Sequence, residues 1–396
     1  MHRHVLFSVL AMVWIAMAAG CAQRTTPSPC PPVSIGASGP FSGVEQLLES
    51  CVRSGAFPGA VLTVGNRDSV IYSVAVGRYG DEDTRPVSSN SIYDLASLTK
   101  VIGLTTAVMV LVSDGKLDLE SHLSEFFPRV AGTVNETITV RHLLTHTSGL
   151  PAWRPLHLET STREEAIDSV LGATLESLPG EQYRYSDFGA ITLGLIVESV
   201  AGESLDVFLQ NQVFGPLGMT STRFRPPAEW LNRIAPTEND PWRGQVVRGE
   251  VHDENAARLG GVAGHAGLFS TGPDLAKFAQ WIMRSLNGLP DTLYGVRIDP
   301  ATVRTFVERQ PGPEGSTRAL GWDTPSDEGS SAGTLLSRTS FGHTGFTGTS
   351  IWIDHERDIY IILLTNRVHP SRENSQMGWV RARVADSVVT ALERMR

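Results

Sequence analysis

The sequence predicts an α/β protein of the α+β kind, in which an antiparallel sheet is assembled from both ends of the chain and carries a largely helical inserted lobe. Two observations predict this class. Strand-like runs rich in β-branched residues occur near each end, whereas the long middle of the chain has mostly helical and loop patterns. The 396 residues, 41% of them hydrophobic, suffice for one large domain or two coupled subdomains with a substantial core.

A helix and a hairpin are predicted near the N-terminal end of the folded part. Apolar residues at helical spacing predict a helix over 41–53. The β-branched runs at 59–64 and 70–76 predict two strands, and the turn-forming residues 65–68 between them favour a hairpin.

The rest of the chain is predicted as helices followed by strands and a closing helix. The helix at 101–111 is apolar on nearly all sides and should be buried. We therefore expect a folded domain over 41–396, with a sheet lobe from about 41–95 and 319–396 and a helical lobe from about 96–318. The remaining predicted helices are 163–171, 189–200, 205–212, 274–285 and 379–395, and the remaining predicted strands are 320–322, 341–343, 349–353 and 359–364.

The first twenty residues have the composition of a signal peptide. His2-Arg3-His4 precedes an uncharged apolar stretch that is short for a membrane span and long enough for a signal-peptide core. Small residues lead into Cys21, so residues 1–20 resemble a bacterial lipoprotein signal, in which Cys21 would be lipidated; an ordinary signal peptide with a chance cysteine is the alternative. Residues 21–40 would then be a Pro-rich tether to the envelope membrane, facing the periplasm, with the outer membrane favoured over the inner.

Composition also limits the partners that we expect. The net charge of −9 does not suggest a nucleic-acid partner, and we expect no later segment to span a bilayer. No Gly-rich phosphate loop with a following Lys is present, so no cofactor is expected. Cys30 and Cys51 could form a disulfide in an oxidising compartment or remain two thiols, and the sequence leaves both open.

Ser97 and Lys100 form the most informative motif of the chain, an S-x-x-K just before the long apolar run. Side chains three residues apart lie on one helix face, so the amine can reach the hydroxyl. A serine hydroxyl becomes a good nucleophile only when a base takes its proton. A lysine can do this when burial or a neighbouring cation lowers its pKa. A chance S-x-x-K on a helix is the alternative, because the motif is short.

Two further segments could complete a catalytic site. Tyr185 lies in a loop before a predicted helix, where its phenol could point into a cleft and relay protons, although a half-buried structural tyrosine is more common. The Gly-rich stretch 341–349 contains His343–Phe346. Its backbone could approach a ligand closely and supply an N–H group to an oxyanion, or it could simply form a tight bend.

In the order S-x-x-K, Y-x-D and H-T-G, these motifs resemble those of the serine β-lactamase and penicillin-binding-protein family. The resemblance covers about residues 41–390. It implies a β-lactamase/transpeptidase-like fold and a serine hydrolase that acts through an acyl-enzyme without a metal. One branch, which includes penicillin-binding protein 4B and enzymes that trim muropeptides, is similar to this chain at 142–151, 216–219, 251–256 and 260–271.

The resemblance also implies a role for each motif residue. Ser97 would be the acylated nucleophile and Lys100 its general base. Tyr185 would protonate the leaving group and later activate water. The backbone N–H groups of Ser97 and Phe346 would hold the oxyanion. The strand against which the substrate lies would include His343, Thr344 and Gly345.

Two residues depart from the β-lactamase pattern. Asp187 stands where β-lactamases carry Asn, and a carboxylate near Lys100 would favour the protonated amine and oppose its use as a base. Either Asp187 is turned away, or Tyr185 takes more of the proton transfer. His343 stands where β-lactamases carry Lys, which removes a permanent cation that could hold a substrate carboxylate. Both changes argue against efficient β-lactam hydrolysis and are compatible with a peptidase, amidase or esterase.

We therefore expect a cell-envelope serine hydrolase acting on peptidoglycan peptides, as a D-alanyl-D-alanine carboxypeptidase-like enzyme or a muropeptide amidase. The alternatives are a carboxylesterase of the same fold and a non-catalytic peptidoglycan-binding lipoprotein. A zinc site at His142 and His146 is disfavoured, because Leu143 stands where zinc peptidases carry Glu and no third ligand is nearby. His265, in a Gly-rich loop, is expected to be a structural hydrogen-bonding residue.

Overall fold

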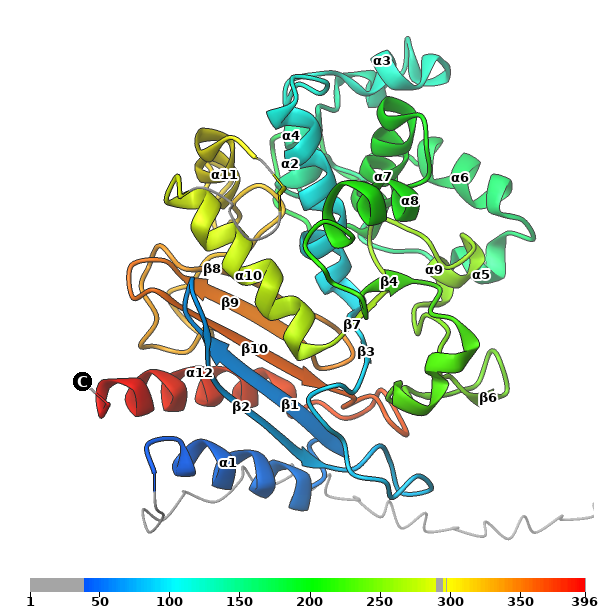
Figure 1. Cartoon of the computed structure of the whole chain (residues 1–396). Coiled ribbons are helices and arrows are strands. Elements are labelled where there is room, and N and C mark those ends of the chain that lie inside the picture. The colour runs from blue at the N-terminus through cyan, green and yellow to red at the C-terminus, as the bar shows by residue number, and fades with distance from the viewer. Residues whose placement is uncertain (1–38, 290–294, 297, 396) are drawn as a thin grey trace, which may run out of the picture.

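A computed structural model describes residues 39–289, 295–296 and 298–395. The expected α+β architecture is confirmed: strands from both ends of the chain form one sheet, and helices from the middle form a second lobe beside it (Figure 1). The predictions for the signal peptide, the tether up to residue 38, Cys21 and Cys30 lie outside the described residues. Cys51 is buried in the first helix, so its pairing with Cys30 stays untested.

The main sheet is antiparallel and has the strand order β2-β1-β10-β9-β8. β1 pairs with β10 at its centre, with Val61 opposite Leu364, so the two ends of the chain meet there. The predicted hairpin and the three predicted strands between 341 and 364 are confirmed. The strands are β1 (Gly59–Gly65), β2 (Val70–Gly77), β8 (Phe341–Thr344), β9 (Ser350–Asp354) and β10 (Ile359–Thr365).

The strand predicted at 320–322 is wrong. These residues form a bend, and only isolated bridges flank it, from Asp323 to Arg318 and to Gly342. Gly321 has φ +78°, a conformation that glycine adopts at little cost and that turns an extended chain. The bend also closes a hydrogen bond from the N–H of Ala319 to the carbonyl of Trp322. The apolar residues of this segment are therefore buried without belonging to a strand.

Helices cover both faces of the sheet. α1 (Ser42–Arg53) and α12 (Met377–Glu393) lie on one face, and α10 (Gly272–Leu286) packs on β1 and β10 from the other (Figure 1). Alternate residues of β10 enter the two cores: Ile361 faces α1 and α12, whereas Ile362 faces α10. A strand buried on both faces is apolar throughout, which is why β10 is an unbroken hydrophobic run.

The helical lobe is built from short helices around α7 (Asp187–Ala201). α10 lies within residues 96–318, which the sequence assigned to the helical lobe, yet it packs on the sheet. The other helices are α2 (Thr106–Ser113), α3 (Leu123–Phe126), α4 (Val140–Leu144), α5 (Leu156–Glu159), α6 (Arg163–Leu171), α8 (Leu205–Leu209), α9 (Glu254–Arg258) and α11 (Pro300–Val307). Small strands complete the fold: β3 (Tyr93–Asp94), β4 (Arg223–Phe224) and β7 (Leu268–Ser270) in one sheet, with β5 (Asn239–Asp240) and β6 (Gln245–Val246) in another.

The predicted apolar helix starts earlier than residue 101 and changes type along its length. A 3-10 turn (Ala96–Leu98) leads into π-helical geometry (Thr99–Thr105) and then into α2. By length and composition, Ala96–Ser113 could cross a membrane, which contradicts the expectation that no later segment could. Because 83% of this segment is buried inside the fold, it has the character of a core helix.

Hydrogen bonds join the segments that carry the first and third motifs. The N–H of Leu95 donates to the carbonyl of Leu268, and the hydroxyls of Thr347 and Thr349 donate to the carbonyls of Asp94 and Leu95. The turn between β8 and β9 is thereby fixed against the chain just before Ser97. This contact places the end of β8 beside the 3-10 turn, although about 250 residues separate them.

Phe278 tests the contact between α10 and the sheet. It is fully buried, with its ring centroid 5.8 Å from that of Trp281 and 6.4 Å from that of Trp322. We expect Phe278→Ala to lower the free energy of unfolding by about 3–5 kcal/mol in denaturant titrations, because it leaves a cavity in the core. Val207→Ala, at a position 44% exposed, is the control and should change it by less than about 0.5 kcal/mol. Equal effects would contradict this account.

Candidate active site

Ser97 lies in a tightly held turn. Ala96, just before it, has φ +46°, an unfavourable conformation for a residue with a Cβ atom. The Asp94 carboxylate holds this turn by accepting hydrogen bonds from the N–H groups of Ala96 at 2.8 Å and His252 at 2.7 Å. Strained backbone that its surroundings enforce in this way is frequent at functional sites.

Lys100 reaches Ser97 across the 3-10 and π-helical turns. Its Nζ atom donates to Ser97 Oγ at 3.1 Å and to the carbonyl of His265 at 3.0 Å, and lies 2.7 Å from the Asp187 carboxylate. Its side chain is only 3% exposed. Burial opposes the charge, but the nearby Asp187 carboxylate and Tyr185 phenol outweigh it and hold the pKa of Lys100 above its usual value. Lys100 is therefore an ammonium, and Asp187 is not turned away from it.

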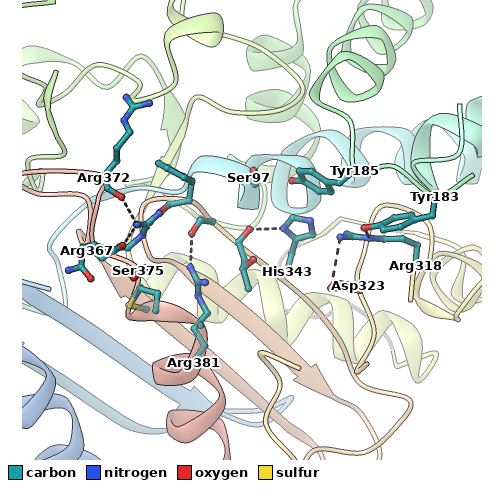
Figure 2. A pocket seen from close by; sticks show the side chains of 16 residues that line it. Ser97, Tyr183, Tyr185, Arg318, Asp323, His343, Arg367, Arg372, Ser375 and Arg381 are labelled. Carbon is teal, nitrogen blue, oxygen red and sulfur yellow. Dashed lines mark hydrogen bonds and ion pairs between the residues drawn. The ribbon is translucent and has the colours of Figure 1, made fainter. Parts of the chain in front are cut away.

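Tyr185 lies close to two cations. Lys100 Nζ is 4.9 Å and the Arg318 guanidinium carbon 5.2 Å from its ring centroid. In Figure 2 the Tyr185 hydroxyl points toward Ser97. The phenol therefore lies in a positively charged environment beside the nucleophile.

The loop that carries Tyr185 is fixed at its next residue. Ser186 caps α7 by accepting from the N–H of Gly189 at 3.0 Å, and its hydroxyl donates to the carbonyl of Pro151 at 2.6 Å. The N–H of Ser186 donates to His146 Nδ1 at 3.1 Å, and the His146 ring lies 4.5 Å from the Tyr185 ring. The segment predicted to resemble the family at 142–151 therefore supports the tyrosine.

His343 does not replace the missing lysine as a cation. Burial and the positive charges of Arg318 and Lys100 hold the pKa of His343 well below its usual value, so the ring is neutral. Its Nδ1 atom lies 2.8 Å from the Thr344 carbonyl, which can only accept, so Nδ1 carries the proton. Nε2 is then an acceptor, and within the described residues it is buried with no hydrogen-bond partner.

The end of β8 forms the edge of the cavity above Ser97. A Cβ atom at Gly345 would fall on the Thr349 hydroxyl and the Leu95 carbonyl, so only glycine allows this close approach. The N–H of Phe346 donates no hydrogen bond to any described residue. Ser97 is in the first turn of a 3-10 helix, where N–H groups lack helical partners. These two N–H groups are the candidate oxyanion donors.

Two cavities meet at Ser97, and their charges differ. The cationic cavity, of about 560 Å³, is lined by Ser97, Tyr185, His343–Phe346 and an arginine wall, which we define as Arg318, Arg367, Arg372 and Arg381 (Figure 2). The acidic cavity, of about 310 Å³, shares Ser97, Tyr185, Phe346 and Arg372 but adds Asp187, Asp253, Glu254 and Trp153. A substrate crossing Ser97 would pass from one electrostatic environment to another.

Two residues of the arginine wall have nitrogen atoms that make no hydrogen bond to any described residue. Arg318 binds the Tyr183 hydroxyl at 3.1 Å, and Arg381 donates to the Gly345 carbonyl at 2.7 Å. Arg318 Nη1 and Arg381 Nε are buried with no hydrogen-bond partner in the described part of the chain. Burial and the charge of Arg367 lower the pKa of Arg381 to about 10, so it remains a cation at neutral pH. Sequence reasoning missed the wall, because isolated arginines carry no motif.

The other histidines considered in the sequence, His142, His146 and His265, have structural hydrogen bonds. His142 lies at the start of α4, where its Nδ1 accepts from the N–H of Thr139 at 3.2 Å, whereas His146 faces Ser186 and Tyr185. His265 binds Asp253 at 2.8 Å through Nε2 and Lys100 through its carbonyl. Among the residues that the structure describes, no group of three or more His, Cys, Asp or Glu side chains could hold a metal ion.

Comparison with known families assigns the fold. The chain matches the β-lactamase family over residues 44–386. The protein belongs to the β-lactamase family. The resemblance carried by Ser97, Lys100, Tyr185 and the H-T-G strand is therefore confirmed at the level of the family.

Two curated relatives resemble most of the chain. A protein of Escherichia coli (strain K12), provisionally named D-alanyl-D-alanine carboxypeptidase, is 32% identical over 350 residues, which are 79% of each chain. N-acetylmuramyl-L-alanine amidase of Bacillus subtilis (strain 168) is 31% identical over 362 residues, which are 82% of this chain and 80% of that protein.

Solved structures confirm the β-lactamase/transpeptidase-like fold of this family member. EstCE1, a hydrolase with promiscuous acyltransferase activity, has a TM-score of 0.69 at 24% identity and covers 87% of this chain and 97% of its own. A penicillin-binding protein homologue from Caulobacter crescentus has a TM-score of 0.71 at 17% identity, over 91% and 100% of the two chains. At these identities the likeness supports the fold alone.

Proposed function

We propose that this protein is a serine hydrolase that acts on peptidoglycan peptides through an acyl-enzyme, as a D-alanyl-D-alanine carboxypeptidase-like enzyme or a muropeptide amidase. One observation carries the proposal: where the two cavities meet, the Ser97 hydroxyl accepts a hydrogen bond from the buried Lys100 ammonium. The names of two relatives, a carboxypeptidase and an amidase, support the substrate class.

The chemistry of the proposed reaction has two steps. Ser97 Oγ attacks the amide carbonyl, and the N–H groups of Ser97 and Phe346 stabilise the resulting oxyanion. The hydroxyl proton passes through Tyr185 to the leaving amine as the C–N bond breaks, which leaves an ester on Ser97. Water then attacks this ester, gives one proton back through Tyr185 to Ser97 Oγ and releases the acid.

Tyr185 fits the role of proton acceptor better than Lys100. The family resemblance implied that Lys100 is the general base, but an ammonium paired with Asp187 has no lone pair to accept a proton. Tyr185 lies near the cations of Lys100 and Arg318, and its hydroxyl points toward Ser97, so the phenol oxygen is placed to exchange a proton with the Ser97 hydroxyl. Lys100 would then act as a fixed positive charge and a hydrogen-bond donor.

The arginine wall favours an anionic substrate over a neutral ester. Buried guanidinium groups with unused donors at Arg318 and Arg381 can bind a carboxylate by charge-assisted hydrogen bonds. A peptidoglycan stem peptide carries such carboxylates. His343 stands where β-lactamases carry a cationic Lys, and the arginine wall supplies positive charge in its place. Esterase activity on activated substrates remains compatible with Ser97 chemistry and serves as a probe of it.

Ser97→Ala tests the covalent step. When disaccharide pentapeptide is incubated with the wild-type protein, its product mass should show the loss of either one alanine or the whole peptide. The wild-type protein should also carry an acyl group on Ser97 after reaction with an activated ester. We expect Ser97→Ala to abolish both signals with an unchanged melting temperature, because it removes only a hydroxyl. An unchanged muropeptide beside rapid turnover of short-chain esters would reject the peptidoglycan substrate. Absence of any acylation would favour the non-catalytic binding protein.

Asp187→Asn separates the two proton-transfer schemes. It removes the negative charge that keeps Lys100 protonated, so the pKa of Lys100 should fall. The kcat/KM for an activated ester is measured for both proteins from roughly pH 5 to 10. If the enzyme needs Lys100 as an ammonium, kcat/KM should decline at a lower alkaline pH in Asp187→Asn than in the wild type. Tyr185→Phe should lower kcat/KM by about 10²–10⁴-fold, as expected when a proton-transfer group is lost. An acidic limb that moves to lower pH in Asp187→Asn would instead identify Lys100 as the base.

The cell envelope is the proposed location. Support comes from the sequence of residues 1–20 and from Cys21, where the signal pattern ends. Lipids on Cys21 would tether the domain to the outer membrane, facing the periplasm, where peptidoglycan peptides occur.

Cys21→Ala tests the anchor. In cells fed a labelled fatty acid, the wild-type protein should incorporate label and sediment with membranes, and the variant should do neither, because the acylated thiol is gone. Cys51→Ala is the matched control and should behave like the wild type in labelling. Membrane association that survives Cys21→Ala would contradict a lipid anchor and favour an ordinary signal peptide or another attachment.

A further inference from the structure

Three aromatic side chains, Trp153, His157 and Trp242, form a row that begins in the acidic cavity, and we call it the aromatic row. The ring centroids of Trp153 and His157 are 6.4 Å apart, and those of His157 and Trp242 are 5.0 Å apart. Trp153 lines the acidic cavity with Ser97 and is 48% exposed, and Trp242 is 39% exposed. Two large, accessible indole rings therefore lie near the buried His157 ring, and one of them, Trp153, lines the smaller of the two cavities that contain the nucleophile.

The row is held in place by buried polar contacts. His157, in α5, is buried and joined to Asn255 of α9 through Nδ1 at 3.1 Å. The N–H of Trp242, in the β5–β6 turn, donates to Asp240 at 2.8 Å, and the Arg243 guanidinium carbon lies 4.9 Å from the Trp242 ring centroid. The buried His157 ring is thus fixed, and both tryptophan rings lie close to it, which limits the conformational entropy that they lose when a ligand stacks on them.

Charged hydrogen-bonding groups accompany the aromatic row. In the acidic cavity, Glu254 forms an ion pair of 2.5 Å with Arg372, and Asp253 lies beside it. Trp242 lines a further cavity of about 750 Å³ together with Arg243 and Glu250. Flat apolar faces and strong donors or acceptors therefore occur together in the lining of both cavities.

This combination of apolar faces and hydrogen-bonding groups matches the chemistry of a sugar ring. A pyranose has an apolar face of C–H groups that can lie on an indole ring, and a rim of hydroxyl and amide groups that carboxylates and guanidinium groups can bind. The carboxylates of Asp187, Asp253 and Glu254 are paired with Lys100, His265 and Arg372. The acidic cavity therefore offers a free carboxylate less positive charge than the arginine wall does.

We propose that the aromatic row, Trp153, His157 and Trp242, is a saccharide subsite that binds the N-acetylated sugar of a muropeptide. The proposal rests on the hydrolase function proposed above and deepens it. With the sugar over Trp153 and the peptide along the arginine wall, the bond over Ser97 is the amide that joins the sugar's lactyl carboxyl group to the peptide. The acyl-enzyme then carries the lactyl sugar on Ser97, and the peptide leaves with its amine protonated.

A pair of substrates tests the subsite by turnover. One is a muramoyl tripeptide, and the other is the corresponding lactoyl tripeptide, which keeps the scissile amide but lacks the sugar ring. We expect kcat/KM to be roughly tenfold or more higher with the sugar, the factor that one good aromatic contact supplies. In Trp153→Ala this ratio should fall toward one. Leu158→Ala, at an exposed position on α5, is the control and should keep the wild-type ratio.

A binding measurement keeps the proposal testable if neither peptide is cut. N-acetylmuramic acid alone should change the tryptophan fluorescence of Ser97→Ala protein in a saturable way, and the added Trp153→Ala substitution should remove most of the change. A ratio near one in the wild type, or saturable binding that survives loss of Trp153, overturns the subsite. Cleavage of neither peptide, with Ser97 still acylated by an activated ester and one alanine still removed from disaccharide pentapeptide, rejects the amidase reaction and keeps the carboxypeptidase of the proposed function. If the pentapeptide is also unchanged, the peptidoglycan substrate is rejected, and in both cases the binding result alone decides the saccharide subsite.

Discussion

The buried ammonium of Lys100 is the interaction on which the site depends. It contacts Ser97, the carbonyl of His265 and the carboxylate of Asp187, which come from three separate segments of the chain. A buried charge that loses its partner costs about 3–5 kcal/mol, so the fold must keep these groups around the amine. The same contacts that satisfy the charge also aim the Ser97 hydroxyl at the point where the two cavities meet.

The sheet provides the second constraint. The turn after β8 is tied to the chain before Ser97 by the hydroxyls of Thr347 and Thr349. A substrate that lies along β8 must therefore pass over the nucleophile. Because β8 belongs to a sheet buried by helices on both faces, the edge of the site is rigid while the cavity in front of it stays open.

The distribution of charge explains how a familiar framework can serve a different substrate. His343 is neutral, and the positive charge of the cavity comes from arginines just before the 320–322 bend, on the loop before α12 and on α12 itself. Across Ser97, carboxylates and exposed tryptophans line the other cavity. This asymmetry suits a substrate that is anionic at one end and neutral but polar at the other, which fits an amide between a sugar acid and a peptide better than a small neutral ester.

The sequence by itself determined the parts that near neighbours specify. The hairpin, the unbroken apolar run of β10 and the S-x-x-K at the start of a buried helix depend on local spacing and burial pattern, and they were predicted with nearly correct bounds. The sequence also raised the question of Asp187 but could not answer it, because the direction of a side chain depends on what packs around it. Only the tertiary structure decided that Asp187 faces Lys100, that 320–322 bends at Gly321, and that scattered arginines and tryptophans gather on opposite sides of one serine. Charges and rings far apart along the chain follow no local pattern, so their meeting is a property of the fold.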